Sequence, residues 1–104
     1  MDIAEKVEAL KDWLSNRMGA EVDSGFDPVA DTYWFRILLD VPLPPMLSVR
    51  PSVFEDHSVE EIRSDLGLLE VPGILGKESA PHLLYERSGD VTKITLMRII
   101  ERLL

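Results

Sequence analysis

The chain of 104 residues contains no cysteine. Disulfides, thiolate nucleophiles and cysteine-ligated metal centres are therefore excluded. Histidine is scarce as well, and the two that occur, His57 and His82, are too few for a zinc site of several histidines within one chain. The lack of cysteine fits a reducing compartment, so we expect a cytoplasmic protein, and nothing in the sequence indicates a bound cofactor.

Long hydrophobic runs are also missing. No apolar stretch approaches the roughly 18 residues that a membrane span requires, and residues 1–6 form an acid-containing amphipathic segment that differs from a secretory signal. The apolar content is still 45%, which is enough for a chain of this length to bury roughly 65% of its unfolded surface. We therefore expect one domain, residues 1–104, with one hydrophobic core.

Basic residues are fewer than acidic ones: the chain has eleven Lys and Arg and nineteen Asp and Glu, for a net charge of −8. The excess of acids is concentrated in residues 1–31, whereas residues 82–104 are mildly basic. Because nucleic-acid binding depends on Lys and Arg displacing counterions from phosphates, nucleic acid is disfavoured as a partner. A neutral or basic protein partner remains compatible with this surface.

The N-terminal half predicts a helix followed by strands. Apolar residues at helical spacing between Ile3 and Met18, a cap at Asp2 and a glycine at position 19 predict the first helix. Residues 20–31 are expected to be a loop with a short strand at 21–24. Alternation over residues 32–41 predicts a strand, and a second strand over 46–55 is expected to pair with it as an antiparallel hairpin. Because Pro51 lacks a backbone donor, that second strand is expected to lie at an edge or to contain a bulge there.

The C-terminal half predicts two helices around one strand. Ser58 and Glu61 form a capping-box sequence at the start of a helix that ends before Pro72. Residues 70–81 are expected to be irregular, 82–87 a short strand, and 90–104 a last helix. The predicted order is α-β-β-α-β-α, an α+β fold with a small, mostly antiparallel sheet of three to four strands and three helices, mostly on one face.

The densest set of candidate metal ligands is Glu55, Asp56 and His57, followed by Glu60 and Glu61. Carboxylates and imidazole are suitable ligands for divalent metals, so a small metal-dependent hydrolase is one hypothesis, with His82 as a further candidate. The alternative is structural, because acids favour the first turn of a helix and the capping box explains Ser58 and Glu61. We favour the structural interpretation.

The segment from Gly73 to Gly76 has a Gly-x-x-Gly spacing. Together with the predicted α-β-β-α order before it, this spacing is similar to one topology of KH domains, where such a loop clamps a nucleic-acid backbone. The two middle residues, Ile74 and Leu75, are apolar and supply no positive charge. A KH-like nucleic-acid binder is therefore the most distant of the three hypotheses. The aspartates at 23, 27 and 31 lack the spacing of a calcium-binding loop.

Two apolar features exceed what a single copy needs to bury. Trp34 and Leu38 fall on the polar-leaning face of their predicted strand, and the predicted last helix is apolar around more than half its circumference, including Met97, Ile100 and Leu104. We take these five residues as candidate interface residues. In size, charge and rough element order the chain is similar to small acidic α/β dimers such as type III secretion chaperones. The leading hypothesis is a non-catalytic, homodimeric interaction domain, acting as an adaptor, accessory subunit or small chaperone.

Overall fold

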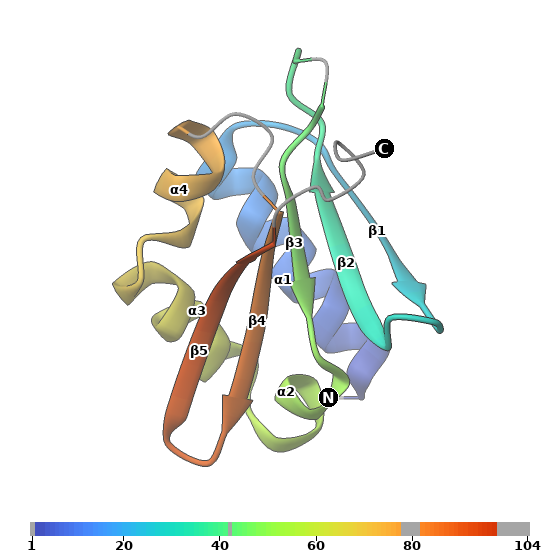
Figure 1. The fold of residues 1–104 in the computed structure, drawn as a ribbon, viewed down its shortest axis with the longest axis vertical. Coiled ribbons are helices and arrows are strands. Elements are labelled where there is room, and N and C mark those ends of the chain that lie inside the picture. The colour runs from blue at the N-terminus through green and yellow to red at the C-terminus, as the bar shows by residue number, and fades with distance from the viewer. Residues whose placement is uncertain (1, 42, 78–81, 98–104) are drawn as a thin grey trace.

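The computed structural model describes residues 2–41, 43–77 and 82–97, and its centre is a five-stranded mixed sheet (Figure 1). The strands lie side by side in sequence order: β1 (Val22–Asp27), β2 (Thr32–Ile37), β3 (Met46–Val49), β4 (His82–Ser88) and β5 (Val91–Met97). The pairs β1–β2, β2–β3 and β4–β5 are antiparallel, and β3–β4 is parallel. The α+β class is thus confirmed, while the sheet is larger than the three or four strands expected.

Four helices are described, and they cover the same face of the sheet: α1 (Ile3–Met18), α2 (Pro51–Asp56), α3 (Val59–Leu68) and α4 (Val71–Lys77) (Figure 1). The prediction of α1 is confirmed in detail. The Asp2 carboxylate accepts the Glu5 N–H at 2.8 Å, and Gly19 ends the helix in the left-handed conformation, with a φ of 63°. Helices α2 to α4 form the long crossover that parallel neighbours such as β3 and β4 require.

The prediction of a strand over residues 46–55 is wrong beyond Val49, because Pro51 begins helix α2. A proline at the first helical position has a suitable φ, and the N–H that it lacks would have had no partner within the helix. Val53 and Phe54 are then buried on the inner side of α2. Strand β3 also lies between β2 and β4, so its expected position at a sheet edge is wrong as well.

The expected ending of the chain needs two corrections. Residues 71–77, predicted as irregular, form helix α4, and residues 91–97, predicted as helix, form strand β5. Gly89, with a φ of 60°, begins the two-residue turn between Ser88 and Val91 that lets β5 fold back on β4. β-Branched residues at 91, 92, 94 and 95 favour this strand. The remainder of the expected helix, residues 98–104, lies outside the described residues.

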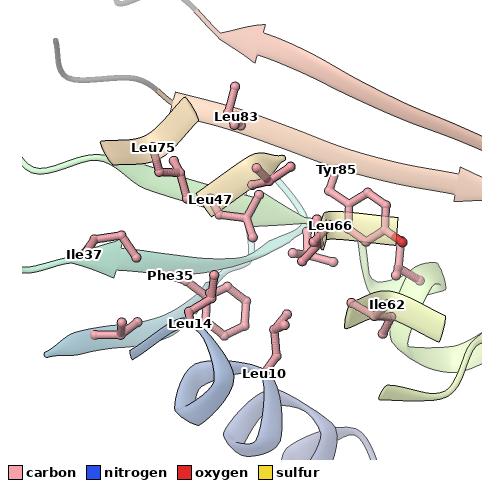
Figure 2. Close-up of a cluster of buried hydrophobic side chains, with 14 of the residues drawn as sticks. Leu10, Leu14, Phe35, Ile37, Leu47, Ile62, Leu66, Leu75, Leu83 and Tyr85 are labelled. Atoms are coloured by element: carbon pink, nitrogen blue, oxygen red, sulfur yellow. The ribbon is translucent and has the colours of Figure 1, made fainter. Parts of the chain in front are cut away.

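The hydrophobic core lies between the sheet and the helices (Figure 2). Alternate residues of the strands point into it, including Phe35 and Ile37 of β2 and Tyr85 of β4, and the inner sides of the helices close it with residues such as Leu10 and Leu66. The opposite face of the sheet, here called the open face, has none of the described helices against it (Figure 1). The candidate functional site is on this open face.

Candidate functional site

The open face is organised in rows, because residues paired across neighbouring strands point to the same side of a sheet. Its central row consists of Gly25, Trp34, Ser48, Leu84 and Thr95. The next row has Asp27 and Thr32 at one end and Glu86 and Lys93 at the other, with Arg50 between them just beyond β3. An acid and a base therefore occupy opposite ends of one row.

Trp34 dominates the central row. Its indole lies over Gly25, where an added Cβ would come within 2.5 Å of the ring, and the Arg36 guanidinium stacks on it 5.1 Å from the ring centre. Trp34 is consequently half-buried within one copy and retains an accessible part. Trp34 belongs to the open-face row of β2, whereas Leu38 lies just beyond the end of that strand at Ile37 and is 43% exposed.

A hollow of about 120 Å³ opens beside Trp34, and Met46, Ser48, His82 and Leu84 form much of its wall. The Ser48 hydroxyl and the His82 Nε2 are 2.7 Å apart. Burial lowers the pKa of His82 and so favours the neutral imidazole, which can accept the hydroxyl proton. Within the described ranges no carboxylate hydrogen-bonds to His82, so the pair lacks the orienting group of a nucleophilic triad.

Arg50 connects separate strands of the open face near the β1–β2 turn. Its guanidinium donates to the carbonyls of Ala30 and Asp31, at 2.6 and 3.3 Å, and lies 3.6 Å from the Glu86 carboxylate. It therefore ties the β1–β2 turn to strand β4 across the intervening strands.

The predicted metal cluster lies elsewhere, at the junction between α2 and α3. Glu55, Asp56 and His57 border a shallow hollow that also contains Lys6, whose ammonium donates to the carbonyls of Phe54 and His57 at 2.6 and 3.0 Å. A fixed ammonium group opposes cation binding there. In the part of the chain that the structure describes, no three potential ligands gather around one point. His82 lines the open-face hollow instead, so the two halves of the hydrolase hypothesis do not meet.

His57 and Glu61 have local roles. The imidazole is buried, with Nδ1 3.6 Å from the Glu61 carboxylate, which in turn lies 3.7 Å from Arg87. The Ser58 backbone N–H that donates to Glu61 lowers the pKa of this carboxyl, and the Ser58 hydroxyl and the Arg87 charge act in the same direction. The capping box predicted from the sequence is therefore present at the start of α3.

Sequence reasoning missed a polar network centred on Asp65. Its Oδ2 accepts the Tyr85 hydroxyl at 2.7 Å, Arg87 Nη1 at 3.0 Å and the Thr92 hydroxyl at 3.2 Å. Burial, followed by the hydrogen bond to Asp65, raises the pKa of Tyr85 well above its usual range. The four residues are spread over α3, β4 and β5, and no local pattern marks them. Ser48 was missed for the same reason.

The other sequence candidates are placed as follows. Gly73 and Gly76 lie within helix α4, so the segment that the KH-like hypothesis requires as a loop is helical. The Asp27 carboxylate accepts the N–H groups of Val29 and Ala30 in the β1–β2 turn. Met97 ends β5, paired with His82. Ile100 and Leu104 lie outside the described residues.

Comparison of the chain with protein-family models, with curated proteins and with solved structures finds no match in any of the three. Among the described helices, none combines the length and apolar character needed to cross a membrane.

Proposed function

We propose that this protein is a non-catalytic protein-interaction domain that forms a homodimer by packing the open faces of two copies against each other. The supporting observation is the row that has Asp27 at one edge of the sheet and Lys93 at the other. A twofold axis along β3, the middle strand, sets β1 of each copy over β5 of its mate. Asp27 of one copy then faces Lys93 of the other at both ends of the interface.

The same axis brings complementary shapes together at the centre. Trp34 of one copy lies over the hollow of the other at the position of Leu84, which is itself buried within one copy, because β2 and β4 flank the axis symmetrically. Aromatic side chains seated in a pocket near the centre are typical energetic anchors of interfaces. Arg36, stacked on Trp34, adds a polar rim.

The size of the open face sets the expected affinity. Five strands about 4.8 Å apart and about 20 Å long present roughly 480 Å² per copy, compared with about 800 Å² per partner in a standard interface. The proposed dimer is therefore weak, with association in the micromolar range. Sedimentation velocity over a micromolar concentration series measures it directly, and a monomer throughout that range contradicts the proposal.

Charge reversal tests the geometry of the dimer. Lys93→Glu places two acids against each other at both ends of the interface and is expected to raise the dissociation constant about tenfold. The control, Lys11→Glu, makes the same change of net charge on α1, in the helical layer, and should leave association near the wild-type value.

A double-mutant cycle makes the test specific. Asp27→Asn removes the facing charge but keeps an oxygen that can accept the turn N–H groups, so Lys93→Glu should weaken association much less in that background. Equal effects of Lys93→Glu in both backgrounds would refute the proposed pairing of β1 with β5.

A further inference from the structure

The outer edge of β1 has no partner strand among the described residues. The Leu38 N–H donates to the Glu21 carbonyl at 2.9 Å, and this bond sets the alternation along the strand. Residues 21, 23, 25 and 27 direct their backbone groups toward β2, so Val22, Ser24 and Phe26 direct theirs outward. Within the described part of the chain, the outward Ser24 N–H is bonded only to the adjacent Asp23 carboxylate, at 3.0 Å. An added strand can replace that local bond.

An apolar groove runs beside this edge. It has a volume of about 390 Å³ and lies between Ile3 and Val7 of α1 and Phe26 and Tyr33 of the sheet. Phe26 is 45% exposed, and its ring lies 4.8 Å from that of Tyr33. An extended segment beside β1 would direct alternate side chains into this groove, because the groove is on the helical side of the sheet.

The remaining side chains of the added strand would point to the open-face side of the sheet, where they would meet acidic residues. Asp23 and Asp27 flank Gly25 on the open-face side of β1. Lysine or arginine at alternate positions of the added strand would complement these charges. A second copy of β1 is a poor occupant, since an antiparallel pairing centred on Gly25 sets Asp23 of one copy opposite Asp27 of the other.

We propose that the β1 edge binds an extended polypeptide segment in which apolar and basic residues alternate, by adding it to the sheet as a sixth strand. Backbone hydrogen bonds to Val22, Ser24 and Phe26 provide the affinity, as in other cases of strand addition. The groove selects the apolar residues, and Asp23 and Asp27 select the basic ones. This surface is the edge of the sheet, so its occupation does not require the homodimer.

The test uses a blocked peptide that alternates valine and lysine, carries a fluorophore and is kept below the concentration at which it self-associates. Fluorescence anisotropy with the full chain should show saturable binding. Two control peptides separate the contributions: one alternates valine and glutamate, and the other groups the same valines and lysines into two blocks. Both should bind at least about tenfold more weakly. Equal binding of the block peptide contradicts strand addition.

Ser24→Pro removes an outward N–H while sparing the β1–β2 ladder, since edge strands tolerate proline where the N–H faces solvent. It should weaken binding about tenfold, whereas the matched Ser24→Thr variant, which retains the N–H, should bind like the wild type. The double variant Asp23→Asn/Asp27→Asn should reduce affinity for the lysine peptide at low salt and have little effect at high salt.

Amide hydrogen exchange of the wild-type chain supplies a readout that needs no variant. Peptide should slow exchange at Val22, Ser24 and Phe26 more than at the helical layer. Unchanged exchange at these three amides, or undiminished affinity in a folded Ser24→Pro variant, would overturn the proposal and leave only non-specific attraction to an acidic protein. Ser24→Pro should leave homodimer association at its wild-type value, because Ser24 is at the edge of β1 and has no place in the open-face rows, so failure of the dimer and failure of the edge site are distinguishable.

Discussion

Asp65 is the residue that most clearly joins separate parts of this protein. A single carboxylate oxygen accepts bonds from Tyr85, Arg87 and Thr92, and so connects α3 to both strands of the C-terminal hairpin. Arg87 is only 14% exposed, so it would lose its main counter-charge in a poorly solvated place if Asp65 were neutralised.

Asp65→Asn is therefore expected to lower the free energy of unfolding by about 2 kcal/mol. Urea unfolding followed by circular dichroism measures the change. Asp12→Asn, the same substitution at an exposed position of α1, should stay within about 0.5 kcal/mol of the wild type. Similar losses in the two variants would mean that the Asp65 network contributes little.

His82 gives a prediction about pH. Burial lowers its pKa below the ordinary value of about 6.5, so the unfolded chain takes up a proton at a pH where folded His82 remains neutral. The associated stability is present above about pH 6.5 and is lost as the pH falls through the pKa of the folded state. A two-dimensional NMR titration should place the midpoint of His82 below that of the acid-unfolded chain, and an equal or higher midpoint would contradict the burial argument.

For individual residues, the sequence indicates which side chains are candidates for function but not which partners those side chains contact. Trp34 was identified because its strand alternates, and the capping pair Ser58 and Glu61 because it is local. Ser48 and Asp65 could not be found, since their partners lie 34 and at least 20 residues away along the chain. Polar side chains acquire such partners only when distant segments pack.

At the scale of elements, the β4–β5 hairpin is the clearest departure from expectation. Leucine, isoleucine and methionine near the C-terminus indicated a helix, yet residues 91–97 pair with β4 along its whole length. The turn at Gly89 decides the outcome, because its positive φ of 60° returns the chain and makes β4 available as a neighbour.

Gly89→Ala is expected to cost about 1 kcal/mol, because a side chain at a positive φ meets its own backbone. Thermal unfolding measures the loss. Gly73→Ala is the matched control, because Gly73 lies in helix α4 and has open space around it. This variant protein should be slightly more stable than the wild type, since alanine has a higher helix propensity than glycine. A neutral Gly89→Ala would argue against the turn that the structure assigns to this position.

Pro51 is compatible with two different structures for residues 46–55, an edge strand and the start of a helix. The sequence predicts that Pro51 lies in an edge strand, but this residue begins helix α2, and β3 is a short central strand. The length of a strand between two partners depends on how far those partners extend beside it. A pattern of four or five apolar residues cannot specify this, because both a strand and a short helix would bury them.

At the scale of the whole molecule, all four described helices share one side of the sheet, and this leaves two surfaces with different characters. The open face has opposite charges at the two ends of a row, which favours a second copy. The β1 edge has acids beside an apolar groove, which favours a basic, extended partner. The first surface is a face and the second an edge, and the two share Asp27, where β1 meets the open face.

Four features could be predicted without coordinates, because they depend on composition and on residues a few positions apart: the α+β class, the first helix with both caps, the capped start of α3 and the acidic N-terminal third. The folded chain was needed to show that β3 is central, that 91–97 is a strand, and that Asp27 and Lys93 share a row. Strand order and register depend on pairing between distant segments, and the energy of that pairing is spread over the whole sheet rather than carried by any local motif.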